Sequence, residues 1–249
     1  MESFADHFSS QSGIYAKYRP HYPTELFQYL GDISSDHQLA WDCATGNGQS
    51  AIYLTDHFEK VIATDPSEKQ ISYAFPHPRI SYYVAKAESS GLGDASVDLI
   101  TVSQALHWFD LKLFYKEVNR VLKPGGVIAA WCYGLPSISP KADPLVKHFH
   151  SVTVDEFWQE GNRMVEREYA GLMFPYEEEP SSAFTMNKKM NADDLCGLLR
   201  SWSATERFRA AKGYDPVEEF EKEIRLAWPE NEYETATWKI TLKAGRKKK

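Results

Sequence analysis

Residues Leu39–Gln49, LAWDCATGNGQ, join a short apolar run to an acid and a turn of small residues. The run ends in Asp42 and the turn spans Ala44–Gly48, a pattern that predicts a strand, a tight loop and a helix. Glycine has no Cβ and adopts positive φ readily, so a ligand can lie against bare backbone there. A second apolar run, Val61–Thr64, ends in Asp65, where a carboxylate reaches ribose hydroxyls in nucleotide-binding folds. The two stretches predict a site for a nucleoside-bearing cofactor.

The overall composition is typical of a folded chain and argues against general nucleic-acid binding. The 249 residues are 43% hydrophobic and carry a formal net charge of −7. Nucleic-acid binding needs a concentrated basic surface, which this charge does not favour. The terminal run Arg246–Lys249 is a local basic patch, and we interpret it as a solvated tail.

The spacing of the cysteines and the length of the apolar runs indicate the cellular compartment. Cys43, Cys132 and Cys196 are far apart and fit neither zinc spacing nor a disulfide framework, so we expect reduced thiols and no metal site. The first twenty residues lack a secretory signal pattern. The longest apolar run, Val127–Tyr133, is far shorter than the ~20 residues of a membrane span. We therefore expect a cytoplasmic protein without a membrane segment.

Strand and helix patterns alternate from Leu39 to Tyr133, which predicts an α/β fold with a parallel sheet and helices on both faces. Asp110 is a predicted cap for the clearest helix, and Lys123–Gly126 is predicted to end it. The expected strands are 39–43, 61–64, 80–84, 97–102 and 127–131, and the expected helices are 49–57, 68–75 and 111–122.

The regions on either side of this core have a different texture. Residues 1–38 are aromatic and contain prolines, with a short predicted helix at 25–30. After Tyr133 we expect a proline-serine loop, a helix over 147–173, a strand at 184–190, helices at 191–202 and from 216, and a strand at 235–243. We expect one domain over 1–249: an N-terminal lid segment (1–38), a cofactor-binding core (39–133), a substrate-covering insert (134–180) and a C-terminal part of the sheet (181–249).

The motifs of residues 39–133, taken in order, resemble those of the class I methyltransferases that use S-adenosylmethionine, type 11-like. They are the acid-ended glycine turn, Asp65, Ala87-Glu88, the strand Val97–Gln104 and the stretch Arg120–Gly126. The resemblance implies a doubly wound, Rossmann-like sheet of seven mostly parallel strands with the last antiparallel, and a helical N-terminal lid and insert. It also implies S-adenosylmethionine as cofactor and no metal. The family usually has glycine where this chain has Ala44, a change that is tolerable if φ is negative there.

The same resemblance assigns roles to individual residues. The turn residues Asp42, Ala44, Gly46 and Gly48 would face the methionine part of the cofactor, Asp65 with Pro66 the ribose, and Ala87 with Glu88 the adenine. Further cofactor contacts are expected from Tyr18, Arg19, Ser103 and Gln104, and substrate contacts from Tyr15 and Trp108.

Each role has a plainer structural alternative. Asp42 can cap the following turn, Asp65 can cap the next helix, and Glu88 can cap or be solvated. His107 follows the fourth strand at the edge where ligands bind, so it is a candidate general base, or else a histidine that holds its loop. Arg19 can pair with a carboxylate or lie at the surface.

Finer features resemble a small-molecule branch that includes trans-aconitate-methyltransferase-like proteins. They are the segments Phe8–Pro23, Ala105–Phe109 and Ser201–Ser203. This resemblance implies direct in-line methyl transfer to a small molecule, with a carboxylic acid as the leading candidate. The sequence does not identify the oligomeric state, and we favour a monomer. Three alternatives stay open: a methyltransferase of RNA or protein, a nicotinamide-dependent oxidoreductase, and a regulator that binds S-adenosylmethionine without catalysis.

Overall fold

The computed structural model describes residues 18–229 and 232–248, which divide into two compact units. The sheet unit comprises the described residues of 22–133, 167–184 and 240–249, and the helical unit those of 1–21, 134–166 and 185–239. Tyr15 lies outside the described residues. The chain leaves the sheet unit after Tyr133, where the composition of the sequence also changes.

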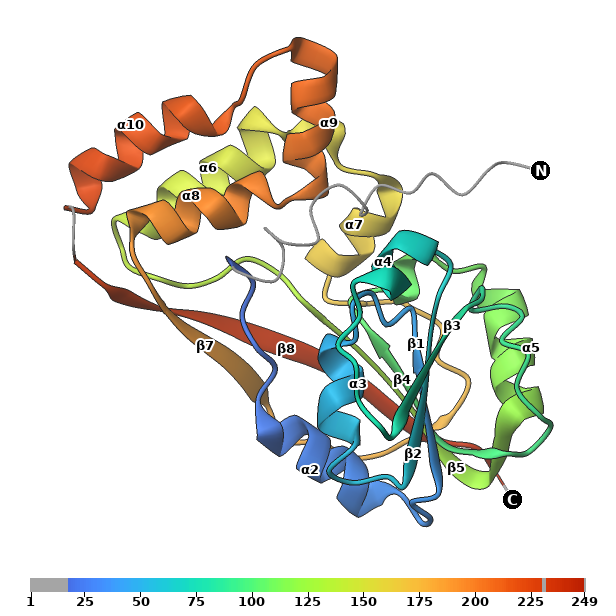
Figure 1. The fold of residues 1–249 in the computed structure, drawn as a ribbon. Helices are drawn as coiled ribbons and strands as arrows, with labels where there is room; N and C mark the ends of the chain where they lie inside the picture. Colours follow the sequence, from blue (N-terminus) through green and yellow to red (C-terminus); the bar gives the residue numbers. More distant parts are fainter. Residues whose placement is uncertain (1–17, 230–231, 249) are drawn as a thin grey trace. The chain divides into compact units, whose positions relative to one another are not determined.

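The strands form a sheet with the order β3-β2-β1-β4-β5-β8-β6, and β7 pairs with β8 (Figure 1). Strands β1 to β5 are parallel, whereas β8 is antiparallel to both β5 and β6. The Rossmann-like, mostly parallel sheet with antiparallel C-terminal strands is therefore confirmed. The bounds are β1 Leu39–Cys43, β2 Lys60–Asp65, β3 Ile80–Val84, β4 Val97–Ser103, β5 Leu122–Tyr133, β6 Glu177–Glu178, β7 Phe184–Met190 and β8 Glu234–Arg246.

Three strands differ from expectation. Strand β8 extends to Arg246, which pairs with Glu179 at 2.6 Å, so the interpretation of Arg246 as part of a solvated tail is wrong. Strand β6 has two residues, which is too short to leave a periodic pattern, and the sequence analysis missed it. Strand β5 begins at Leu122, directly after the preceding helix, rather than at Val127. Leu122 pairs with Val97, and the register shifts before Val127 pairs with Leu99. Gly125, with a φ of 79°, lets the strand continue through this irregularity.

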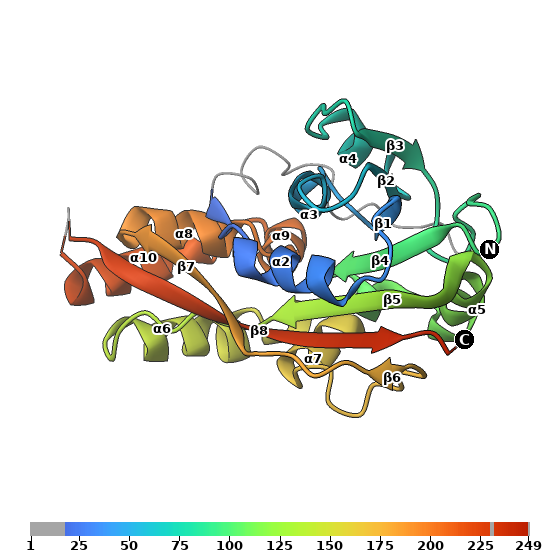
Figure 2. The ribbon, with the colours of Figure 1, turned by 90° about the horizontal axis from the view of Figure 1, so that it is seen from below.

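Helices cover both faces of the sheet unit, as expected. Helices α2 and α3 lie on one side of the strands and α5 on the other (Figures 1 and 2). Asp110 caps α5 by accepting a hydrogen bond from the Leu113 N–H at 3.1 Å, and Phe114 and Val118 are buried. The bounds are α2 Thr24–Ile33, α3 Gln49–Leu54, α4 Glu68–Ser72, the 3-10 helix η1 Leu106–Trp108 and α5 Leu111–Val121.

The helical unit contains the second set of helices. The single helix expected over 147–173 is wrong, because the chain breaks after Thr153 at Val154, where φ is −112° and ψ 12°, and becomes extended at Trp158. Asn191 begins the predicted C-terminal helix with a capping box to Asp194. The bounds are α6 Ala142–His148, the π-helix η2 Phe149–Thr153, the 3-10 helix η3 Asp155–Phe157, α7 Glu160–Glu166, α8 Ala192–Arg200, α9 Ser203–Lys212 and α10 Val217–Ala227.

The turn after β1 has repeated left-handed backbone. Gly46 and Gly48 have φ values of 58° and 89°, which only glycine adopts without strain. Ala44 has a φ of 55°, so the expectation that its φ would be negative is wrong. The methyl group of Ala44 is therefore held in a conformation that costs free energy, at the position where the resembling family usually has glycine.

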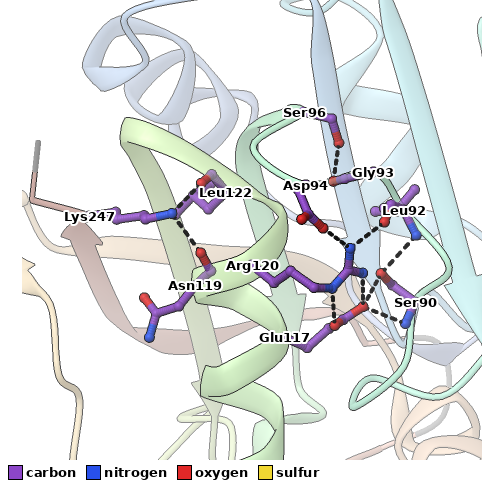
Figure 3. Close-up of polar contacts among 10 residues, drawn as sticks. All are labelled: Ser90, Leu92, Gly93, Asp94, Ser96, Glu117, Asn119, Arg120, Leu122 and Lys247. Carbon is purple, nitrogen blue, oxygen red and sulfur yellow. Dashed lines mark hydrogen bonds and ion pairs between the residues drawn. The ribbon is translucent and has the colours of Figure 1, made fainter.

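A polar cluster fastens the loop after β3 to α5 (Figure 3). Glu117 Oε1 accepts hydrogen bonds from the Ser90 N–H at 2.8 Å and from Arg120 Nη2 at 2.7 Å. Arg120 Nη1 also donates to Asp94 at 2.6 Å and to the Leu92 carbonyl at 2.7 Å. Hydrogen bonds from Arg120 and Ser90 lower the pKa of Glu117 to about 2. The loop that contains Ala87 and Glu88 is thus anchored through a buried carboxylate.

The strain at Ala44 predicts opposite effects for two substitutions. A left-handed φ costs a residue with a Cβ about 1–2 kcal/mol, whereas an added glycine costs about 0.5–1 kcal/mol through the unfolded chain. Ala44→Gly should therefore raise the free energy of unfolding by up to about 1 kcal/mol, and Gly46→Ala should lower it by about 1 kcal/mol. Urea unfolding of the ligand-free protein measures both, and a less stable Ala44→Gly variant would contradict the account.

The low pKa of Glu117 predicts an acid-sensitive contribution to stability. Its stabilising effect is fully present above its ordinary pKa of 4.5 and is lost as pH falls through the folded-state pKa of about 2. Glu117→Gln should lower the free energy of unfolding at neutral pH by about 1–3 kcal/mol and flatten its dependence on pH below about 4.5. Glu219→Gln is the matched control, because Glu219 pairs with Lys222 at the same helical spacing with both side chains exposed. An equal loss in the two variants would refute the special role of Glu117.

Candidate functional site

Asp42, at the end of β1, lies beneath the turn and holds it in place. Its side chain is fully buried, and its oxygens accept hydrogen bonds from the hydroxyls of Thr45 at 2.5 Å and Thr101 at 2.7 Å. The Ala51 N–H also hydrogen-bonds to it, while burial raises its pKa to about 6. The carboxylate therefore shapes the turn from below, which fits the capping alternative.

Asp65, at the end of β2, joins two turns at the carboxyl edge of the sheet. Its carboxylate accepts hydrogen bonds from the Gly46 N–H and the Ser67 N–H, both at 2.9 Å. Ser67, rather than Asp65, is the N-cap of α4, so the helix-cap alternative for Asp65 is wrong. The Asp65 carboxylate therefore links the turn after β1 to the turn before α4.

The backbone of the turn is open at one glycine and covered at the next. A Cβ added at Gly46 would meet Gln70 at 4.0 Å as its nearest neighbour, whereas one at Gly48 would lie 2.4 Å from the hydroxyl of Tyr82. Bare backbone beside a buried carboxylate fits an adenosyl compound, whose ribose needs acceptors and whose remaining parts need close approach. Asp65, Pro66 and the Gly46 backbone are the residues that would hold it.

The predicted adenine-side segment lies in the anchored loop. Ala87 is buried, and Glu88 Oε1 accepts a hydrogen bond from the Asp110 N–H at 3.0 Å. This contact links the segment to the start of α5, so Glu88 has the capping role that the sequence left open. Whether the neighbouring backbone meets an adenine stays a prediction.

The end of β4 is tied to its neighbours by two side chains. The Ser103 hydroxyl donates to the hydroxyl of Tyr22 at 2.6 Å. Gln104 has a φ of 53°, and its amide exchanges two hydrogen bonds of 3.0 Å with the backbone of Tyr133. The side-chain amide of Gln104 therefore adds two hydrogen bonds between the end of β4 and strand β5, at a left-handed bend of the backbone. Roles for Ser103 and Gln104 toward the cofactor stay predictions.

His107 is held in the 3-10 helix that follows β4. Its Nδ1 lies 3.2 Å from the hydroxyl of Tyr169, and its ring lies 4.6 Å from that of Trp108, centre to centre. Burial lowers the pKa of His107 to about 4, so the imidazole is neutral at physiological pH. A base of such low pKa is a weak proton acceptor, and the contact with Tyr169 fits the loop-holding alternative.

Two tyrosines at this edge were missed by the sequence analysis. Tyr22 is buried against Trp131, with ring centres 5.6 Å apart, and accepts the bond from Ser103. Tyr169 comes from a segment that was predicted to be helical, and it follows Glu168 in two successive left-handed residues. Nothing in single-sequence periodicity marks such a bend, whereas Tyr22 stands among the aromatic residues of the N-terminal segment and could have been proposed.

The remaining predicted cofactor residues belong to the helical unit. An added Cβ at Gly197 would lie 2.5 Å from the Tyr18 ring, so Tyr18 packs against α8. The carbonyl of Arg19 accepts a hydrogen bond from Lys188 Nζ at 3.4 Å. Their contacts with a cofactor stay predictions.

Within 18–229 and 232–248, no group of three or more His, Cys, Asp or Glu side chains is arranged to hold a metal ion. No helix in this part of the chain is both long and apolar enough to cross a membrane. Cys43, Cys132 and Cys196 are free and buried, and burial raises the pKa of each thiol.

Comparisons with known proteins agree with this geometry. The family described as a methyltransferase domain (Methyltransf_11) matches residues 41–130. A candidate methyltransferase of Dictyostelium discoideum is 33% identical over 90% of this chain and 87% of its own length. An uncharacterised methyltransferase of Schizosaccharomyces pombe is 28% identical over 86% and 83%.

A solved structure extends the likeness to the whole fold. A candidate type II methyltransferase from Anaeromyxobacter dehalogenans is 39% identical, with a TM-score of 0.85 over 92% of this chain and 98% of that one. A relative that matches over most of its length, a solved structure of similar fold and a glycine turn beside two buried acids thus agree. This chain belongs to the class I methyltransferases that use S-adenosylmethionine.

Proposed function

We propose that this enzyme transfers the methyl group of S-adenosylmethionine to a carboxylate oxygen of a small organic acid. The observation that supports this acceptor is the state of His107, which is neutral, held by Tyr169 and of low pKa. General bases work best when their pKa lies near the working pH. A carboxylate acceptor is already anionic at neutral pH, so it needs no base.

Asp42 and Asp65, two acids of the carboxyl edge, are held in structural hydrogen bonds. Asp42 is fully buried and accepts hydroxyl hydrogen bonds from Thr45 and Thr101. Asp65 accepts backbone bonds from Gly46 and Ser67. A protonated amine or hydroxyl acceptor would require a proton acceptor among these groups, whereas a carboxylate requires only correct placement.

The roles of the chain's own residues follow from this chemistry. When bound, S-adenosylmethionine supplies an electrophilic methyl group on a sulfonium. The acceptor oxygen forms the new O–CH3 bond as the S–CH3 bond breaks, the sulfur keeps that electron pair, and no proton is released. Asp65 binds the ribose hydroxyls, Gly46 allows close approach, and Asp42 is a positioning residue that fixes the turn.

Small acceptors are favoured over macromolecules by charge. A net charge of −7 repels RNA, which binds through its phosphates. Small organic acids are anions too, but they need only one local cation rather than a basic surface. RNA and protein acceptors remain measurable outcomes of the acceptor experiment below.

The role of Asp65 predicts a loss of cofactor affinity that a matched acid does not share. Asp65→Asn should raise the dissociation constant of S-adenosylhomocysteine about 10- to 100-fold, because charge-assisted bonds to the ribose are lost. Asp98→Asn is the control, since Asp98 is also buried and also accepts two backbone N–H bonds, from Gln38 and Leu39. Titration calorimetry should show near-wild-type affinity for the control. Equal affinities in the two variants would remove the ribose assignment.

The carboxylate acceptor predicts a base-labile product and a dispensable His107. Mono-, di- and tricarboxylates, RNA and protein are offered with S-adenosylmethionine labelled in its methyl group. Label should enter small acids as methyl esters, which release volatile methanol in alkali. With the best acid, His107→Ala should lower turnover by less than about 10-fold, whereas removing a true general base costs about 100- to 10,000-fold.

Other products would contradict this acceptor. Alkali-stable label on a small molecule would point to nitrogen or carbon methylation, and label in RNA or protein would point to a macromolecular acceptor. A loss at His107→Ala in the range of a true base would show that a proton is removed during transfer.

A further inference from the structure

Arg207, in α9 of the helical unit, has buried donors without a protein acceptor. Its Nη1 donates to the carbonyl of Phe157 at 2.9 Å. Its Nε and Nη2 are hidden from solvent and have no hydrogen-bond partner among residues 18–229 and 232–248. A buried donor left without a partner costs about 1–3 kcal/mol, and more when the group is charged. Such a side chain needs an explanation beyond packing.

Two other arginines of the helical unit, Arg200 and Arg163, have carboxylate partners from the protein itself. Arg200 uses the same two donors on two carboxylates, Nε on Asp215 at 2.7 Å and Nη2 on Glu221 at 2.9 Å. Arg163 pairs with Asp155 at 2.8 Å. The Nε and Nη2 donors of Arg207 hydrogen-bond to no carboxylate among the described residues.

The surroundings of Arg207 favour an anion. The acid that acts electrostatically on it is its neighbour Glu206, while burial lowers its pKa from the ordinary value. An arginine stays charged in proteins regardless. Lys212 places a second cation 6.0 Å from the ring centre of Phe157, whose carbonyl already binds Arg207. Partial burial strengthens any ion pair formed there, because solvent screens it less.

We propose that the Nε and Nη2 donors of Arg207 bind a carboxylate group of a small molecule within the helical unit. These two donors are parallel and adjacent, the geometry that takes both oxygens of one carboxylate. The carboxylate belongs to a free organic acid. The site stands on Arg207 itself and does not depend on the proposed acceptor.

Nuclear magnetic resonance of arginine side chains tests the site directly. The Nε–H signal of Arg207 is assigned by its loss in Arg207→Gln, and the whole protein is then titrated with succinate, with S-adenosylhomocysteine, and with sodium chloride at matched ionic strength. Succinate should shift this signal saturably, and chloride should not.

Variants of Arg207 then measure how much its paired Nε and Nη2 donors contribute to the affinity for the ligand. The dissociation constant of succinate should rise at least about 10-fold in Arg207→Gln. Arg207→Lys, which keeps the charge but not the paired donors, should fall between Arg207→Gln and wild type. Arg209→Gln is the matched control, because Arg209 lies on the same helix.

Two results would overturn the site. One is an Arg207 Nε–H signal that succinate does not move beyond chloride. The other is equal weakening by Arg207→Gln and Arg209→Gln, which would show a general charge effect. If Arg207→Gln fails to fold, Arg207→Lys and the wild-type titration decide the question. Loss of this site with intact S-adenosylhomocysteine binding would leave the methyltransferase assignment untouched.

Discussion

The hydrogen bond from the Gly46 N–H to Asp65 joins the turn after β1 to the end of β2, and the rest of the site depends on it. A second bond, from the Thr45 N–H to the Thr64 carbonyl, runs beside it. Beneath them, Asp42 accepts bonds from Thr45 and Thr101 and so fixes the other side of the turn. Two buried carboxylates thus hold one short backbone segment from two directions.

Two strained residues lie at the carboxyl edge of the sheet unit. Ala44 and Gln104 have left-handed φ values at the ends of β1 and β4, and each is held by neighbours that are themselves fixed. Gln104 is secured by two bonds to Tyr133, and the turn by the two acids. Strained residues persist where the surroundings over-determine them, and they concentrate at functional sites. Between these residues, the backbone of Gly46 has space beside it, because an added Cβ there would meet only Gln70, at 4.0 Å.

The strands of the sheet unit and the position of the glycine turn could be predicted from the sequence, because the patterns that indicate them are local. Alternating apolar runs and turns predicted strands β1 to β5, and acids at two strand ends predicted the cofactor edge. The conformation of Ala44 could not be predicted, since it follows from bonds made by Thr45 and Asp65 after folding. Tyr169 reaches His107 through a bend of two left-handed residues, which single-sequence periodicity does not encode. The partnerless donors of Arg207 likewise depend on which acids the fold places elsewhere.

The most direct test of the central claim is a crystal structure of this protein with bound S-adenosylhomocysteine. The account predicts that the ribose hydroxyls lie within hydrogen-bond distance of the Asp65 carboxylate. It also predicts that the ligand rests against the Gly46 backbone, with Asp42 still bonded to Thr45 and Thr101. A ligand whose ribose lies beyond hydrogen-bond reach of Asp65, or a turn that releases Asp42 on binding, would contradict the account.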